Sequence, residues 1–217
     1  MITIQPEIEI LSTESYEDML RRIEKIGRVC YKSEERIGEG TAEKFIAGII
    51  KRGHESVIEH GSITVKVTCD RGVTHEIVRH RLASYAQEST RYCNYAKEKF
   101  GNQITYIDPV PGFTIENRAY SVEQMEAIMA EWIAACEDAE RHYLRLIELG
   151  CSPQMARGVL NNATKTEIVV TMNMREWRHF IGLRTSAAAH PQMREIAQEV
   201  LRIFREKLPV IVADITH

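Results

Sequence analysis

The sequence of 217 residues contains no run of the roughly 18 to 20 apolar residues that a membrane-spanning helix needs. A secretory signal is also absent, because Met1–Ile10 carries acidic residues and no lysine or arginine ahead of an apolar stretch. These absences predict a cytoplasmic protein with no membrane partner.

Cysteine is scarce, and its spacing excludes two further classes of protein. The odd number of five cysteines with no Cys-x-x-Cys pair argues against a disulfide framework and a thiolate zinc site. There is no excess of basic charge either, since the net charge is −3, which disfavours a general nucleic-acid surface. Repeats and low-complexity segments are missing as well, so we expect a single domain over residues 1–217.

Hydrophobic periodicity predicts a mixture of helices and strands. Strict alternation of apolar residues predicts a strand at Gly61–Cys69, and β-branched residues predict a second at Thr164–Asn173. Apolar residues at helical spacing, with capping residues, predict helices that end near Tyr31, Gly53, Gly150, Arg184 and Leu208. The proline-rich segment Asp108–Gly112 is interpreted as a loop. The fold class predicted is α+β, with a central antiparallel sheet flanked by helices.

What the chain does have is an unusual concentration of guanidinium groups, hydroxyls and amides in Arg79–Tyr92. If a helix begins near Gly72, then Glu76, Arg79, His80, Ala83, Ser84 and Gln87 share one face. The opposite face, Val73, Ile77, Val78 and Leu82, would then pack on a core. A solvated polar stripe is the plainer interpretation. However, arginine suits two-pronged contacts with phosphate, so the segment favours an anion site.

A second polar segment, His54–His60, places two histidines and two glutamates close together. A helical zinc site needs histidines four residues apart, whereas these are six apart. We therefore predict no metal site.

The run Arg79, His80, Arg81, Ser84, Ser89, Arg91 and Tyr92 resembles the signature of the flavin-dependent thymidylate synthases. Further along the chain, Ala156-Arg157, Asn173-x-Arg175 and Leu183-Arg184 are similar to motifs of the same family. The resemblance covers about His54 to Gln192. It implies a reaction that converts dUMP to dTMP, with 5,10-methylenetetrahydrofolate as carbon donor and FAD, reduced by NADPH or NADH, as hydride source.

The resemblance also implies roles for individual residues. Those expected to bind the nucleotide are Glu76, Arg79, Gln87, Ser89, Arg91, Arg157 and Arg184. Arg184 is the expected catalytic residue, because it would stabilise negative charge on the uracil ring. Those expected to bind the flavin are His54, Ser56, Arg79, His80, Arg81, Gln87, Asn173, Arg175, His179 and His190. Ser89 has no histidine–acid pair beside it in sequence, so we interpret it as a ligand contact and not a nucleophile.

The family resemblance implies a homotetramer with active sites shared between subunits. Two other functions are open to the same residues. Arg79, Arg81, Arg91 and neighbouring tyrosines would suit a nucleic-acid-binding module, although the net charge argues against one. A flavoprotein reductase without methyl transfer is the second alternative.

Overall fold

The computed structural model describes residues 1–216, and these form two compact units. Unit 1 comprises Met1–Glu7, Val67–Val78 and Ala86–Ile168, and unit 2 comprises Ile8–Lys66, Arg79–Tyr85 and Val169–His217. The expectation of a single domain stays a prediction. Among the described residues, no helix combines the length and the apolar character needed to cross a membrane.

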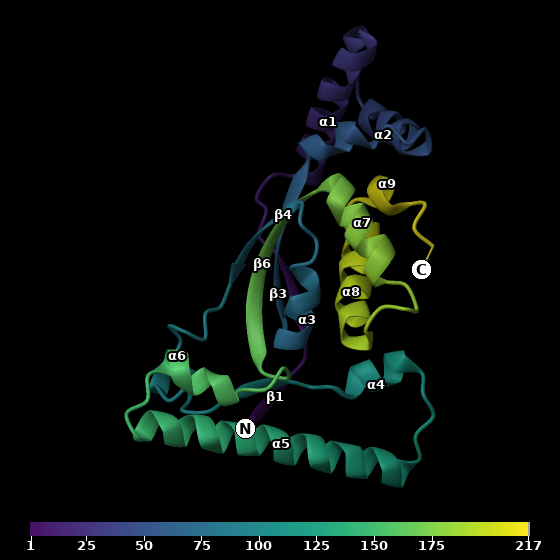
Figure 1. Ribbon diagram of the computed structural model, residues 1–217. Coiled ribbons are helices and arrows are strands. Elements are labelled where there is room, and N and C mark those ends of the chain that lie inside the picture. Colours follow the sequence, from purple (N-terminus) through teal and green to yellow (C-terminus); the bar gives the residue numbers. More distant parts are fainter. Residues whose placement is uncertain (217) are drawn as a thin grey trace. The chain divides into compact units, whose positions relative to one another are not determined.

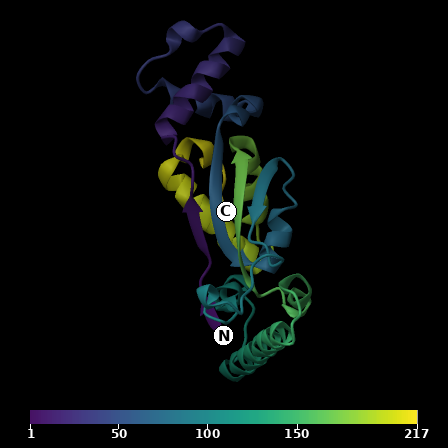
Figure 2. The ribbon, with the colours of Figure 1, turned by 90° about the vertical axis from the view of Figure 1, so that its left-hand side faces the viewer.

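Four strands form the main sheet, in the order β2-β3-β6-β4 (Figure 2). Their bounds are Glu7–Ile10 for β2, Ser62–Asp70 for β3, Lys165–Asn173 for β6 and Ala83–Gln87 for β4. Burial alternates along β6 and along the first part of β3, as alternation of side chains across a pleated sheet requires. The last four residues of β3 are all buried. The antiparallel sheet and its surrounding helices confirm the predicted α+β class.

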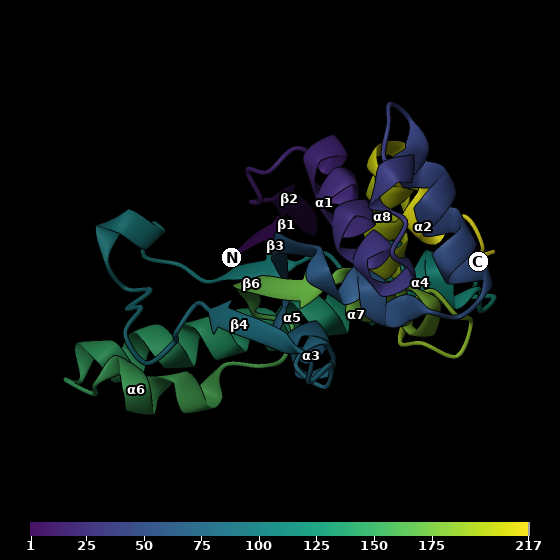
Figure 3. The same ribbon diagram turned by 90° about the horizontal axis from the view of Figure 1, so that it is seen from above.

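In unit 2, α7 (Met174–Arg184) and α8 (Pro191–Lys207) cover one face of the sheet (Figure 1). The indole Nε1 of Trp177 donates a hydrogen bond of 3.1 Å to the carbonyl oxygen of Ile63, which ties α7 to β3. Around them lie α1 (Tyr16–Tyr31), α2 (Thr41–Lys51), α9 (Pro209–Val212) and the 3₁₀ segments Glu34–Arg36 and Glu55–His60. Figure 3 shows α1 beside α2. Their packing buries Met19, Ile23, Ile46 and Ile49.

Unit 1 contains a second, two-stranded sheet in which β1 (Ile2–Ile4) pairs in parallel with β5 (Thr105–Ile107). The long helix α5 (Val122–Glu148) begins with a capping box of Ser121 and Gln124. Only Cys136, Ala139 and Tyr143 are buried on it, and the Tyr106 hydroxyl donates to the carbonyl oxygen of Cys136 at 2.7 Å. The remaining elements are α3 (Arg71–Ile77), α4 (Val110–Glu116), α6 (Pro153–Ala156) and the 3₁₀ segments Glu98–Phe100 and Arg157–Val159.

The prediction of one helix from Gly72 to Gln87 is wrong. The helix α3 stops at Ile77, Arg79–Leu82 form a loop, and Ala83–Gln87 become the strand β4. Pairing with β6 satisfies the backbone of this segment, and such tertiary pairing overrides local helical spacing. As a result, Val73 and Ile77 are buried as expected, while Val78 and Leu82 are exposed.

The prediction of a loop at the proline-rich segment Asp108–Gly112 is also wrong in part, because most of the segment is helical. Val110–Glu116 forms the helix α4, with Pro109 at its cap and Pro111 in its first turn. Proline is tolerated there, because the first backbone N–H groups of a helix have no partner inside the helix.

A first prediction concerns Gly27, where α1 packs on α2. A Cβ at this position would lie 2.5 Å from the Phe45 ring and 2.7 Å from Val57. We expect Gly27→Ala to lower the free energy of unfolding by about 1–3 kcal/mol, since overpacking forces side chains and backbone apart. Gly48→Ala, where a Cβ would meet only the flexible end of Arg52, is the matched control. Urea unfolding measures both. Equal stability of the two variants would contradict the packing described here.

Candidate active site

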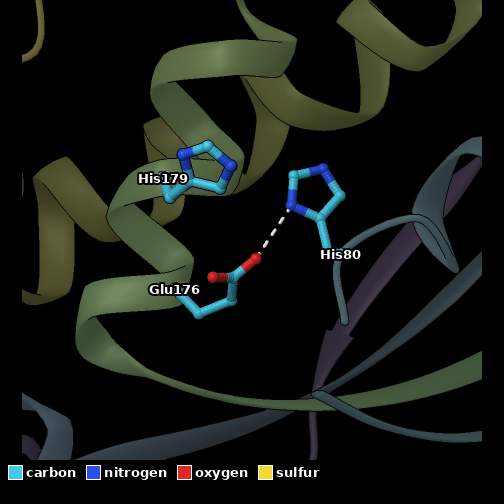
Figure 4. Close-up of side chains that lie close together, drawn as sticks. All are labelled: His80, Glu176 and His179. Atoms are coloured by element: carbon cyan, nitrogen blue, oxygen red, sulfur yellow. Dashed lines mark hydrogen bonds and ion pairs between the residues drawn. The ribbon is translucent and has the colours of Figure 1, made fainter. Parts of the chain in front are cut away.

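The candidate site in unit 2 is built on the first turns of α7. Asn173 ends β6 and caps the helix, since its side-chain oxygen accepts a hydrogen bond of 2.9 Å from the backbone N–H of Glu176. Counting from this cap, Glu176, Phe180 and Arg184 recur at every fourth position and share one face of the helix. His179 lies on the same side as Glu176 (Figure 4).

His80, on the loop after α3, is buried against this face with 4% of its surface exposed. Its Nδ1 lies 3.0 Å from a carboxylate oxygen of Glu176 (Figure 4). The Nε of Arg184 donates to its Nε2 at 3.1 Å. An arginine can only donate, so Nε2 is the unprotonated nitrogen. The proton of the neutral ring is therefore on Nδ1, which donates to Glu176.

The electrostatics of the cluster agree with a neutral His80. Burial lowers the pKa of its imidazole, Arg184 and His179 lower it further, and Glu176 opposes them. The ring also lies edge-on to Phe180, at 5.0 Å between centroids, and the Tyr85 hydroxyl donates to the backbone carbonyl of His80. The loop that carries His80 is thus held at its ring and at its backbone.

Two hollows open beside this cluster, both inside unit 2. One, of about 270 Å³, is lined by Arg79, His80, Arg81, Leu82, Glu176, His179, Leu183 and Arg184. The other, of about 570 Å³, is lined by Glu55, Glu59, Leu82, Asn173, Arg175, Glu176, Arg178, His179 and Ile215. They share Leu82, Glu176 and His179. Sequence-predicted flavin residues separated by some hundred positions therefore line adjoining hollows.

The residues present fit a flavin dinucleotide by the chemistry of their donors. Guanidinium groups suit its diphosphate, and imidazole and amide groups suit the polar edge of its ring. Arg175 is 53% exposed and is engaged by two acids, at 2.7 Å from Glu59 and 3.7 Å from Glu55.

Four predicted flavin residues do not line either hollow: Gln87, which belongs to unit 1, and three residues of unit 2. The Nδ1 of His54 is 2.7 Å from the Tyr31 hydroxyl, Ser56 is exposed on the 3₁₀ segment Glu55–His60, and His190 precedes α8 as its cap. Their assignment to the flavin stays a prediction.

His80, Glu176 and His179 also have the atoms to bind a metal ion, since their ligand atoms lie within 4.8 Å of one another (Figure 4). However, both ring nitrogens of His80 are already used, and a cation at Nε2 would meet the Arg184 guanidinium. The arrangement is therefore explained by hydrogen bonding without a metal.

A separate cluster in unit 1 brings together Ser89, Arg91 and Arg157. The Nε of Arg91 donates to the side-chain oxygen of Gln154 at 3.1 Å, and a terminal nitrogen of Arg157 donates to the Thr90 hydroxyl at 3.2 Å. These two bonds connect the loop after β4 with the short helices around Arg157. Both arginines are exposed, and the side-chain oxygens to which they donate are neutral. By contrast, Arg175 and Arg178 of unit 2 each pair with carboxylates.

The other two nucleotide residues expected in unit 1 lie on α3 and β4. Glu76 is half-buried on α3, and the amide nitrogen of Gln87 donates to the hydroxyls of Thr74 at 3.1 Å and Thr166 at 3.4 Å. A hollow of about 420 Å³ in this unit is lined by Glu88, Tyr95 and Lys165 among others, and by none of the predicted site residues.

Sequence reasoning missed Glu176, Gln154 and Thr90. Glu176 had a usable signal, because it lies eight residues before Arg184 and thus on the same helical face. Gln154 and Thr90 carried no comparable signal, since their contacts join segments more than 60 residues apart.

The fold and the arginine-rich clusters are typical of an enzyme that handles anionic ligands. A family model described as "Thymidylate synthase complementing protein" matches residues 12–210. The chain belongs to the flavin-dependent thymidylate synthase family, which confirms the resemblance inferred from Arg79–Tyr92.

Several relatives carry the name flavin-dependent thymidylate synthase. The protein from Pyrococcus furiosus is 38% identical over 78% of this chain, which spans 65% of that protein's length. The proteins from Geobacter sulfurreducens and Mycobacterium avium are 35% and 37% identical, over 86% and 88% of this chain and 78% of their own lengths. The predicted enzyme class and FAD cofactor, with folate as carbon donor and NAD(P)H as reductant, are confirmed at the level of the family.

A solved structure supports the fold. The UMP/dUMP methylase PolB from Streptomyces cacaoi, bound with 5-Br dUMP, superposes with a TM-score of 0.79 over 97% of this chain and 95% of its own, at 23% identity. At this identity the likeness establishes the fold alone.

A second prediction follows from the buried, neutral His80. Because its pKa is lowered in the folded protein, the unfolded chain binds more protons as pH falls below the ordinary histidine value of about 6.5. Its contribution to stability is therefore complete above that pH and is lost as pH falls towards the folded-state pKa. Urea unfolding between pH 7.5 and 5.5 should show a steeper loss for the wild type than for His80→Asn. Parallel losses would contradict the assignment.

Proposed function

We propose that this chain converts dUMP to dTMP, with 5,10-methylenetetrahydrofolate as carbon donor and FAD reduced by NAD(P)H as the source of hydride. The family match over residues 12–210 is the observation that carries this proposal. The arginines of unit 1 (Arg91 and Arg157) and of unit 2 (Arg175 and Arg184) support it, because the reaction requires both a phosphorylated pyrimidine and a flavin to be bound.

Arg91 and Arg157 are proposed to bind the phosphate of dUMP. Their bonds to Gln154 and Thr90 orient the guanidinium groups while leaving their charge uncompensated by a carboxylate in those contacts. Such a pair favours a dianionic phosphate. Ser89 and Arg79 are proposed to add nucleotide contacts, and Glu76 and Gln87 to orient the polar edges of the substrates.

Arg184 is proposed to act on the uracil base. Bond formation at the ring carbon places negative charge on the carbonyl oxygens, and a guanidinium held in place beforehand stabilises that charge. The bond from the Nε of Arg184 to His80 helps to orient this guanidinium before a substrate arrives. The chain need not supply a covalent nucleophile.

The residues proposed to hold FAD are His54, Ser56, Arg79, His80, Arg81, Gln87, Asn173, Arg175, His179 and His190. When bound, FAD supplies the redox chemistry by carrying a hydride from NAD(P)H. The protein's part is to bind and orient it. Arg175 would contribute to this binding while Glu59 and Glu55 keep its guanidinium in position.

We further propose a homotetramer with shared active sites, in the cytoplasm. The apolar residues of α5 support association, because Val122 is 71% exposed and Ile133 is 37% exposed on a helix that buries little of itself in the subunit.

Dilution tests the tetramer. Activity per subunit should fall as the protein is diluted below the concentration at which sedimentation shows dissociation, because a shared site is incomplete in a monomer. A monomeric preparation with full activity per subunit would exclude site sharing.

The main test is anaerobic incubation of the flavin-loaded protein with dUMP, methylenetetrahydrofolate and NADPH. We expect dTMP to form, and Arg157→Ala to raise the KM for dUMP by about 10- to 100-fold, the value of a charge-assisted contact of about 1.5–3 kcal/mol. Arg141→Ala is the control, since Arg141 is exposed on α5 and paired with Asp138 at 2.8 Å.

Three outcomes would count against the proposal. Flavin oxidation that is insensitive to dUMP would favour a flavoprotein reductase. A colourless protein that binds oligonucleotides would favour a nucleic-acid-binding module. Equal KM values for Arg157→Ala and Arg141→Ala would remove Arg157 from the nucleotide site.

A further inference from the structure

We propose that Glu176 is a positioning residue for Arg184 and acts through the ring of His80. Its carboxylate keeps the imidazole proton on Nδ1, so that Nε2 accepts the hydrogen bond that orients the Arg184 guanidinium. This inference rests on the proposed function only in the role given to Arg184; the relay itself follows from the geometry of unit 2.

The three side chains form a continuous line of hydrogen bonds. Glu176 and His80 are 3.0 Å apart, and His80 and Arg184 are 3.1 Å apart. The two ends of the line come from one face of α7, and the middle comes from the Arg79–Leu82 loop. The line therefore connects the loop of the arginine-rich segment with the expected catalytic residue.

A carboxylate is the side chain that this position requires. An ionised glutamate only accepts hydrogen bonds, so it forces the proton onto the facing nitrogen of His80. A glutamine has both an accepting oxygen and a donating NH2 group, so it no longer restricts the proton to Nδ1. When the NH2 group faces Nδ1, the proton must move to Nε2. That nitrogen would then face the Nε–H of Arg184 as donor against donor, and the bond would be lost.

Burial keeps the partners in this line of hydrogen bonds from being replaced. Glu176 is 7% exposed and His80 is 4% exposed, so neither side chain can readily exchange its partner for water. The edge-on Phe180 ring and the Tyr85 bond to the backbone of His80 restrict rotation of the imidazole. Under these restraints the partner at Nδ1 decides whether Nε2 can accept a hydrogen bond, because the bond at one ring nitrogen sets the tautomer.

The first test observes the tautomer without measuring activity. Protein labelled with ¹⁵N-histidine is examined by long-range ¹H–¹⁵N correlation, with His80→Asn used to assign the His80 signals. We expect the Nδ1–H form alone in the wild type and a mixture of the two tautomers in Glu176→Gln. An Nε2–H or doubly protonated His80 in the wild type would overturn the proposal.

The second test is a double-mutant cycle on turnover. We expect Arg184→Ala to lower kcat by about 10²–10³, the usual loss for one preorganised donor, and Glu176→Gln to lower it by about 10- to 100-fold. Because Glu176 acts through Arg184, adding Glu176→Gln to Arg184→Ala should cause little further loss. Losses that multiply in the double variant would overturn the relay.

Glu24→Gln is the matched control. Glu24 is a buried acid of the same unit, 1% exposed and bonded to Arg28 and Thr41 on α1 and α2. It tests whether neutralising any buried carboxylate lowers kcat. If Glu24→Gln lowers kcat as much as Glu176→Gln does, the loss reflects general destabilisation of the protein. That result would reject the positioning role of Glu176.

The two tests separate this inference from the proposed function. If Arg184→Ala keeps full turnover while the tautomer still depends on Glu176, the role of Arg184 in catalysis fails and the relay stands. If Arg184→Ala is impaired and the tautomer is insensitive to Glu176, the relay fails and the proposed function stands.

Discussion

The hydrogen bond that caps α7 at Asn173 is the constraint on which the unit 2 site depends. It begins the helix at the residue after β6, and the Trp177 bond to β3 then sets the rotation of the helix against the sheet. With start and rotation determined, Glu176 and Arg184 must face the same way. A cap one residue later would turn this face by about 100° and separate Arg184 from His80.

Arginines serve different purposes in the two units. Arg178 is mostly buried and pairs with Asp214 and Glu55, so its charge is neutralised within unit 2 and secures the segment after α9. Arg91 and Arg157 hydrogen-bond to neutral oxygens, and this contrast supports the nucleotide-binding role proposed for them.

Much of the fold could be predicted from the sequence, because it depends on local patterns. The alternation in β3, the capping box of α5 and the helical stripes of α1 and α8 each appear in the structure where the residues indicated. The helix expected through Gln87 failed, because Ala83–Gln87 satisfies its backbone by pairing with β6, which is some 80 residues distant in sequence. The parallel pairing of β1 with β5 could not be predicted either, since no local pattern encodes a distant partner.

The sequence by itself determined the family, the α+β class and the kinds of side chain available to the site, because short motifs and periodicities are local properties of the chain. Only the tertiary structure decided which of these side chains meet. It placed His80 between Glu176 and Arg184, and it joined Arg91 to Gln154. The protonation state of a histidine and the availability of an arginine's charge depend on such neighbours and on burial, and these exist only after the chain has folded.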